Sequence, residues 1–169
     1  MIVHAGLIAL RVRGAWLGAL IEGRSGAGKS DLALRALEVG FRLVADDRTL
    51  VWASGGGLYG RAPGPLHGLI EARGQGILSE SALAFARIAL VAECVDDPEL
   101  IERMPEPAAR VVAGVAAPRL AIDAFEASAP AKLRRALEHL GAAGQQAYLA
   151  PSLCGRGRAG SRAGTGDTH

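Results

Sequence analysis

The hydrophobic positions of this chain form short strand-like runs at both sides of a helix-like segment, with a second helix-like segment near the C-terminal end. Residues 2 to 12 and 15 to 21 are apolar and rich in branched side chains, and turn residues join them, so they predict a β-hairpin. Residues 31 to 39 and 129 to 140 carry apolar positions at helical spacing. Gly40 follows the first helical segment, where a glycine commonly ends a helix.

The rest of the pattern predicts short strands separated by turns and loops. Strands are expected at residues 41–45, 49–53, 57–60, 69–73, 87–92 and 119–122. Residues 62 to 68 form a Pro/Gly loop, residues 79 to 85 a loop or helical turn, and residues 96 to 107 a polar connection. Because hairpins flank the first helix, we expect an α/β fold with a mixed sheet over residues 1 to 140. Residues 141 to 169 are poorly patterned, and we expect a disordered tail there.

Composition narrows the protein class. The 169 residues suit one domain, and 50% hydrophobic with 21% charged residues is ordinary for a soluble globular protein. A formal net charge of +2 is too small to indicate nucleic-acid binding. Cys94 and Cys154 have no His or Cys at metal-ligand spacing, which predicts free thiols in a reducing compartment and argues against a zinc site. No basic leader or membrane-length apolar stretch is present, so the expected location is cytoplasmic, away from membranes.

Residues 23 to 30, GRSGAGKS, satisfy the phosphate-loop pattern G-x-x-x-x-G-K-[ST] between a predicted strand and a predicted helix. The glycines let backbone N–H groups wrap a phosphate, and the helix directs its positive N-terminal end at the same anion. Lys29 would reach the β- and γ-phosphates of ATP, and the Ser30 hydroxyl would hold Mg²⁺. The predicted nucleotide-binding residues are Gly23, Arg24, Ser25, Gly26, Ala27, Gly28, Lys29 and Ser30.

Acidic residues follow at positions suited to phosphoryl transfer. The apolar run LVADD ends in Asp46 and Asp47, about one helix length beyond the phosphate loop. One carboxylate can hold Mg²⁺ while the other accepts a proton from an incoming hydroxyl. Farther on, Glu71 is a hard oxygen ligand and Arg73 a planar cation suited to phosphoryl oxygens. Without the phosphate loop, the acid pair could equally be a turn, and Glu71 with Arg73 an ion pair on an edge strand.

These three motifs, in this order, resemble the catalytic domain of HPr kinase/phosphorylase, the bacterial P-loop enzyme that phosphorylates a seryl hydroxyl of the phosphocarrier protein HPr. The family's G-x-S-G-x-G-K-S loop matches residues 23 to 30, its A-D-D strand end matches residues 45 to 47, and its E-x-R-G-x-G-I signature matches residues 71 to 77. The resemblance covers residues 2 to 140. It implies a compact P-loop kinase fold of the phosphoenolpyruvate-carboxykinase-like type.

The resemblance also implies roles for individual residues. Asp46 would be the proton acceptor, and His4 would match a histidine that lies beside the reacting phosphate. The expected catalytic residues are Asp46, Lys29, His4 and Arg73, and the expected metal ligands are Ser30, Asp47 and Glu71. The implied cofactors are ATP and Mg²⁺, and the implied partner is an HPr-type phosphocarrier protein. The resemblance further implies assembly into hexamers.

The chain departs from the family pattern in three places. The N-terminal domain of the family's long form is expected to be missing. The family's late arginine has no clear match, although Lys132 or Arg134 could replace it, and the segment tied to dephosphorylation is not recognisable in residues 141 to 169. Kinase chemistry is therefore better supported than phosphorylase chemistry. The alternatives are a P-loop kinase or NTPase with another substrate, and a nucleotide-binding sensor without transfer activity.

Overall fold

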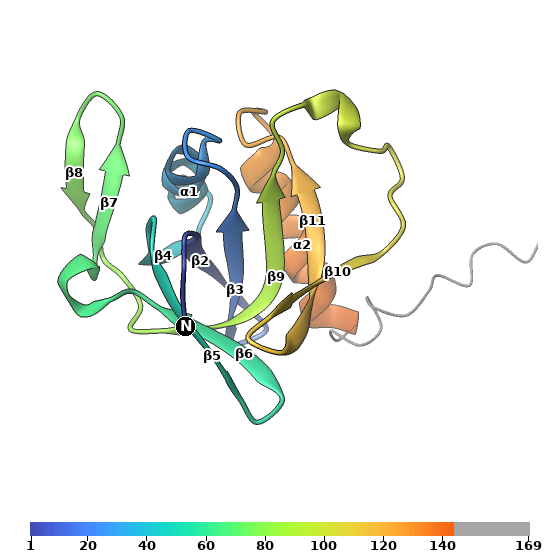
Figure 1. The fold of residues 1–169 in the computed structure, drawn as a ribbon, viewed down its shortest axis with the longest axis horizontal. Coiled ribbons are helices and arrows are strands. Elements are labelled where there is room, and N and C mark those ends of the chain that lie inside the picture. Colours follow the sequence, from blue (N-terminus) through green and yellow to red (C-terminus); the bar gives the residue numbers. More distant parts are fainter. Residues whose placement is uncertain (144–169) are drawn as a thin grey trace, which may run out of the picture.

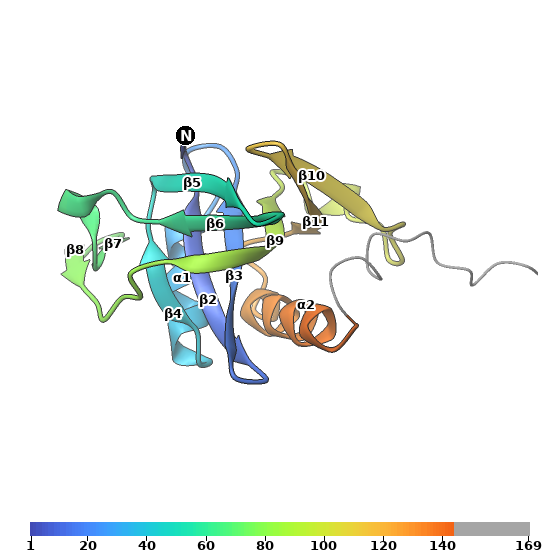
Figure 2. The ribbon, with the colours of Figure 1, turned by 90° about the horizontal axis from the view of Figure 1, so that it is seen from below.

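The computed structural model describes residues 1 to 143, so most of the predicted tail, from residue 144 on, lies outside the described part of the chain. Two helices, α1 (Lys29–Glu38) and α2 (Ala129–Ala143), lie on one face of a strongly curled sheet (Figures 1 and 2). No helix within the described residues is long and apolar enough to cross a membrane. The strands are β1 (Ile2–Val3), β2 (Gly6–Val12), β3 (Ala15–Glu22), β4 (Arg42–Ala45), β5 (Thr49–Ser54), β6 (Gly57–Arg61), β7 (Leu69–Ala72), β8 (Gly76–Ser79), β9 (Ala86–Cys94), β10 (Ala108–Val112) and β11 (Val115–Ile122).

The main sheet has nine strands and is mixed, which confirms that prediction. Its order is β1-β5-β6-β9-β3-β2-β4, with β11 added beside β9 and β10 beside β11. Strands β3 and β11 both run parallel to β9, while β2 runs antiparallel to both β3 and β4. One side of β9 pairs with β6 near its start and with β11 near its end, so the sheet divides and curls at this strand.

These strand directions bring several chain segments to one edge of the sheet. Because β2 is antiparallel to both of its neighbours, β4 points the same way as β3, β9 and β11. The carboxyl ends of these four strands therefore meet at one edge, and β2 begins there. In parallel α/β sheets, ligands bind beyond the carboxyl ends of the strands. The phosphate loop after β3, the acid pair after β4 and residues 123 to 128 after β11 all lie at this edge (Figure 1).

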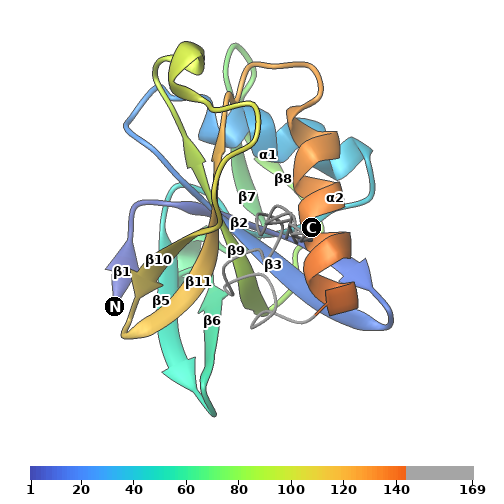
Figure 3. The same cartoon turned by 90° about the vertical axis from the view of Figure 1, so that its right-hand side faces the viewer.

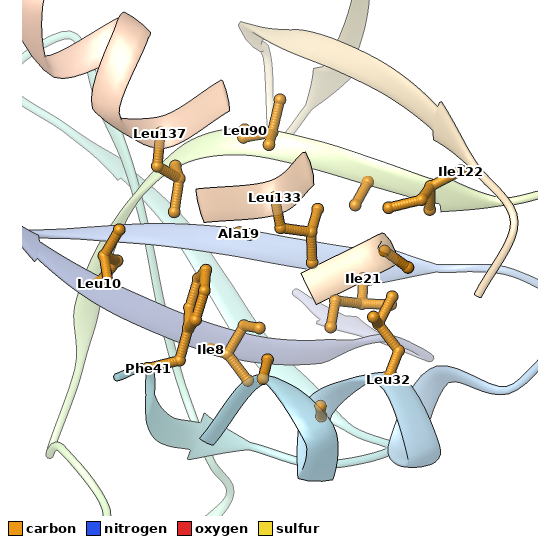
Figure 4. Packing of buried hydrophobic residues seen from close by; sticks show 14 of the residues in the cluster. Ile8, Leu10, Ala19, Ile21, Leu32, Phe41, Leu90, Ile122, Leu133 and Leu137 are labelled. Carbon is orange, nitrogen blue, oxygen red and sulfur yellow. The ribbon is translucent and has the colours of Figure 1, made fainter. Parts of the chain in front are cut away.

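The sheet is covered by a hydrophobic core on each face. On the helix side, Leu32 of α1 and Leu133 of α2 pack against side chains of β2, β3 and β9, including Ile8 and Ile21 (Figure 4). The second core lies inside the curl of the sheet and includes Leu7, Leu20, Val51, Leu58 and Ile88. Figure 3 shows α2 running along one side of the sheet while the β5–β6 hairpin projects away from it. Both helices are thereby fixed in position relative to the site edge.

Most predicted elements are confirmed, including both helices, the first hairpin and the strand that ends in the acid pair. The first predicted strand is divided, because the chain turns between Val3 and Gly6 and β1 pairs with β5 instead of β3. Strands β8 and β10 were not predicted. Both are the exposed partners of hairpins, and their side chains lack the buried apolar alternation that marks a strand in the sequence. Helix α2 continues to Ala143, three residues beyond its predicted end.

Candidate functional site

Residues 23 to 30 form a tight turn from β3 into α1. Gly26 and Gly28 adopt left-handed backbone angles, with φ of 82° and 86°, which side chains rarely tolerate. Gly28 is the N-cap residue of α1, and its carbonyl accepts a 2.8 Å hydrogen bond from Leu32 N. The Lys29 ammonium folds back over the loop and donates to the carbonyls of Gly23, at 3.0 Å, and Arg24, at 2.9 Å. This is the loop-to-helix geometry in which backbone N–H groups bind an anion.

Asp46 connects three elements of the site. Its carboxylate accepts a 2.8 Å hydrogen bond from the Ser30 hydroxyl at the start of α1 and a 2.9 Å bond from the Glu71 backbone N–H on β7. The residue is 7% exposed and is one of three buried polar or charged residues in the described part of the chain. Asp46 therefore ties the phosphate-loop helix to the segment that carries Glu71.

His4 and Asp47 form an exposed pair beside Asp46. The His4 Nε2 atom lies 2.5 Å from the Asp47 Oδ1 atom, and both side chains are more than half exposed. The buried Thr49 hydroxyl donates to the Ala5 carbonyl at 2.7 Å and so fixes the short turn that presents His4. Asp47 has a left-handed φ of 53°, which is uncommon outside glycine, and its carboxylate contacts His4 whereas that of Asp46 contacts Ser30. This backbone position is tolerated by Asp better than by most residues.

A cavity of about 340 Å³ joins these parts. Residues from the phosphate loop, α1, the β7–β8 hairpin and three separate turns line it. They are His4, Ser25, Gly26, Gly28, Lys29, Ser30, Asp31, Leu34, Asp47, Glu71, Ala72, Arg73, Gln75 and Phe125. The cavity thus brings together Lys29, Ser30, His4, Asp47, Glu71 and Arg73 from the predicted site, while Asp46 lies behind its wall.

Some predicted residues lie outside this cavity. Arg24 points to the opposite side of the loop, where its guanidinium pairs with Asp96 at 2.9 Å, and Gly23 lines that same side. Ala27 is buried in the core beneath the loop.

The two basic residues considered as replacements for the family's late arginine also lie outside the cavity. Lys132 pairs with Glu126. Arg134 donates to the Val39 carbonyl at the C-terminal end of α1, so this guanidinium is held at the end of the helix remote from the phosphate loop.

The sequence did not single out Phe125, Gln75, Asp31 or Leu34, all of which line the cavity. Asp31 and Leu34 follow the phosphate loop on α1, so their positions could have been inferred from helical geometry. Phe125 comes from the turn after β11, whose distance along the chain concealed its proximity to the loop. A carbon atom placed at the Cβ position of Gly28 would lie 2.9 Å from the Phe125 ring.

The side chains present fit Mg²⁺ bound together with a nucleotide. Hard oxygen donors gather at the cavity: the Ser30 hydroxyl touches the Asp46 carboxylate, and the carboxylates of Asp47 and Glu71 face the same space. Among residues 1 to 143, however, no three His, Cys, Asp or Glu side chains converge as a ready-made metal site. Mg²⁺ in phosphate-transfer sites usually binds one or two carboxylates and completes its shell with phosphate oxygens and water. The arrangement suits that mode and not an all-protein cage.

Comparison with known proteins identifies the family. Residues 2 to 89 match the family model described as "HPr Serine kinase C-terminal domain". The chain belongs to this family. The matched stretch contains the phosphate loop, the acid pair and the β7–β8 hairpin, which together supply every residue lining the cavity except His4 before β2, the α1 residues Asp31 and Leu34, and Phe125, and of these only Phe125 lies outside the match. The resemblance on which the sequence analysis depended is therefore confirmed, and the family is one of HPr kinase/phosphorylase enzymes.

Curated relatives match over a shorter region. An HPr kinase/phosphorylase from Clostridium perfringens (strain SM101 / Type A) is 46% identical over 67 residues, and one from Clostridium kluyveri (strain ATCC 8527) is 49% identical over 67 residues. Each alignment covers 40% of this chain but only 22% of the relative, so the match spans about a fifth of these proteins' length.

A solved structure shows the same fold over most of the chain. The HPr(Ser) kinase/phosphatase structure from Coxiella burnetii has a TM-score of 0.69 and 21% identity, and the match covers 82% of this chain and 95% of that one. The predicted α/β fold with a mixed sheet is thus supported as a curled mixed sheet like that of an HPr kinase/phosphatase.

Proposed function

We propose that this chain is an ATP- and Mg²⁺-dependent serine kinase that acts on an HPr-type phosphocarrier protein. One observation carries the proposal: a single cavity joins the part of the phosphate loop that carries Lys29 and Ser30 to an exposed acid–histidine pair and to the Glu71 and Arg73 side chains. Family membership in the HPr serine kinase group supports the same conclusion. A hexameric assembly remains a prediction from the resemblance, and a cytoplasmic location remains a prediction from composition; kinase chemistry is better supported than phosphorylase chemistry.

The phosphate loop would bind the triphosphate of ATP. Backbone N–H groups at the start of α1 would donate to the anion, and Lys29 would exchange its bonds to two loop carbonyls for bonds to the β- and γ-phosphates. Mg²⁺ held by Ser30 and the neighbouring carboxylates would neutralise the charge on the β- and γ-phosphate oxygens. The Ser30–Asp46 hydrogen bond shows that a hydroxyl and a carboxylate oxygen already lie together at this point.

The acid pair would divide two tasks. The resemblance gives the proton acceptor role to Asp46, but both oxygens of Asp46 are engaged, one by the Ser30 hydroxyl and one by the Glu71 N–H. Asp47 lines the cavity and is paired with His4, so its carboxylate is within reach of an incoming hydroxyl. A general base must come within hydrogen-bonding distance of the proton that it removes. The contacts therefore favour Asp47 as the general base and Asp46 as the carboxylate that supports Mg²⁺.

The β7–β8 hairpin would complete the site. Glu71 and Arg73 lie on this hairpin, which stands beside α1 (Figure 1). Glu71 would add a metal ligand, and Arg73 would meet the charge that develops on the transferred phosphoryl group. The substrate serine would then enter between this hairpin and the His4–Asp47 pair.

The test is phosphorylation of a purified HPr-type carrier with ATP labelled at the γ-phosphate, in Mg²⁺, by the full chain. We expect label on the carrier, and none on a carrier whose target serine is replaced by Ala. Lys29→Ala should weaken ATP binding by about tenfold or more, since a charged hydrogen bond contributes about 1.5–3 kcal/mol. Arg24→Ala is a matched control, because Arg24 points away from the cavity and pairs with Asp96.

Three results separate the alternatives. Label on the carrier supports the proposal. ATP hydrolysis, or label on another acceptor only, would instead indicate a P-loop kinase or NTPase with another substrate. Tight ATP binding without turnover would indicate a nucleotide-binding sensor. Wild-type ATP affinity in Lys29→Ala would refute the phosphate-loop assignment itself.

A further inference from the structure

Phe125 is an exposed aromatic side chain at the mouth of the phosphate-binding cavity. It is 67% exposed, although its ring lies against Gly28, the N-cap residue of α1. A large apolar ring left open to water costs free energy that burial by a ligand would recover. The residue has no task in the phosphoryl-transfer chemistry described above.

The backbone of the Phe125 turn is firmly held. Arg35 on α1 donates to the carbonyls of Ala124 and Glu126, on both sides of Phe125. The Phe125 N–H donates to the Asp123 carboxylate at 2.9 Å. The ring is thus exposed on a turn that is attached to the phosphate-loop helix. Because the backbone is already fixed, a ligand that packs on the exposed ring would bind without the cost of ordering the turn.

The order of strands indicates which part of a nucleotide would lie there. Along the site edge, the acid pair follows β4 and His4 precedes β2, whereas Phe125 follows β11 on the other side of β3 and β9. The phosphate loop follows β3 and lies between these two groups. In the proposed function, phosphoryl transfer takes place at the acid end, so the γ-phosphate would lie at that end. The opposite end of the nucleotide, its base, must then extend towards Phe125.

We propose that Phe125 is the stacking platform for the base of the bound nucleoside triphosphate, and that it favours purines over pyrimidines. This inference depends on the proposed nucleotide-binding function. A flat aromatic ring stacks on any base, and the larger two-ring purine gains more contact than a single-ring pyrimidine. The effect is a contribution to binding of the base and not to binding of the phosphates.

The experiment measures binding of Mg·ATP, Mg·CTP and inorganic tripolyphosphate to the full chain and its variants. In Phe125→Ala, we expect ATP affinity to fall about fivefold or more, in line with stacking on aromatic side chains, and the preference for ATP over CTP to shrink. Tripolyphosphate, which has no base, should bind as it does to the wild type. Phe125→Tyr retains a flat ring and should keep ATP affinity.

Phe85→Ala is the matched control, because Phe85 is also an exposed phenylalanine, 57% exposed, but it packs beside Trp52 and does not line the cavity. It should change none of the three affinities. Equal losses of ATP and tripolyphosphate in Phe125→Ala would show that the ring only supports the phosphate loop, and unchanged ATP affinity would show that it does not meet the base; either result overturns the inference. Failure of the wild-type chain to bind tripolyphosphate and ATP would instead refute the nucleotide-binding function on which the inference depends.

Discussion

Replacing each member of the acid pair with Asn separates their proposed tasks. Asp46→Asn and Asp47→Asn both keep the size of the side chain and remove its charge and basicity. If Asp47 is the general base, Asp47→Asn should lower the rate of carrier phosphorylation by about 10²–10⁴-fold while Mg·ATP still binds. If Asp46 supports the metal, Asp46→Asn should raise the Mg²⁺ concentration needed for activity, and high Mg²⁺ should recover part of the rate.

The structure also predicts different effects on stability. Asp46 is buried and accepts two hydrogen bonds, from Ser30 and from the Glu71 N–H. In Asp46→Asn the amide oxygen can still accept from Glu71 N–H while the amide nitrogen donates to the Ser30 oxygen, so both bonds survive in neutral form. Hydrogen bonds to charged groups contribute about 1 kcal/mol more than neutral ones, so the loss should be about 2 kcal/mol. Asp47 is more than half exposed, and its pairing with His4 should contribute less than about 1 kcal/mol.

The assay follows carrier phosphorylation against Mg²⁺ concentration for each variant, with ATP binding and urea unfolding measured separately. The reasoning would be refuted by the reverse pattern, in which Asp46→Asn abolishes transfer at every Mg²⁺ concentration and Asp47→Asn retains nearly full activity. Asp46 would then be the base, as the family resemblance suggests. If both variants show the same loss and the same recovery with Mg²⁺, the two acids form one metal site and the proton has another acceptor.

Further predictions concern the metal, the core, the buried thiol and assembly. Glu71→Gln should raise the Mg²⁺ requirement in the same assay, whereas Glu22→Gln, which affects an ion pair outside the cavity, should not. Gly60→Ala should lower the free energy of unfolding by about 1–3 kcal/mol in urea titrations, because the new methyl group would lie 2.6 Å from the Leu7 Cδ2 atom. Burial raises the pKa of the Cys94 thiol from 9.0 to about 11. Between these two pH values the thiol ionises in the unfolded chain but not in the folded one, so the free energy of unfolding falls as pH rises. With Cys154 replaced by Ser in both proteins, the urea midpoint should therefore fall less across this pH range in Cys94→Ala than in the protein that keeps Cys94. Light scattering at micromolar concentration should show an oligomer, and a monomer would contradict the expected hexamer.

Sequence patterns predicted the parts of this fold that have a strong local signal. The helix after the phosphate loop has apolar positions at helical spacing and a terminal Gly40, and the strand before the acid pair is a short apolar run. The hairpin of β7 and β8 was only half predicted, since the exposed residues of β8 carry no buried face. Register and burial depend on neighbours that are distant in the sequence, and no local pattern records them.

The same limit applied to the site. The residue types and their spacing indicated nucleotide binding, but could not show that Asp46 faces Ser30 while Asp47 faces His4. That difference depends on contacts with α1 and with the turn before β2, which only the fold brings together. Phe125 could not be found from the sequence because its proximity to the phosphate loop depends on β11 lying parallel to β9.

The position of Lys29 explains how the phosphate loop keeps its shape around a buried cation. Lys29 is only 8% exposed, and a buried ammonium without hydrogen-bond acceptors would cost several kcal/mol. Two carbonyls at the start of the same loop, those of Gly23 and Arg24, accept its hydrogen bonds. The lysine thereby closes the loop on itself and holds Gly26 and Gly28 in their left-handed conformations between its two ends. A triphosphate would replace these carbonyls with charged oxygens, so the cation that shapes the loop is also the one that would gain most from binding the anion.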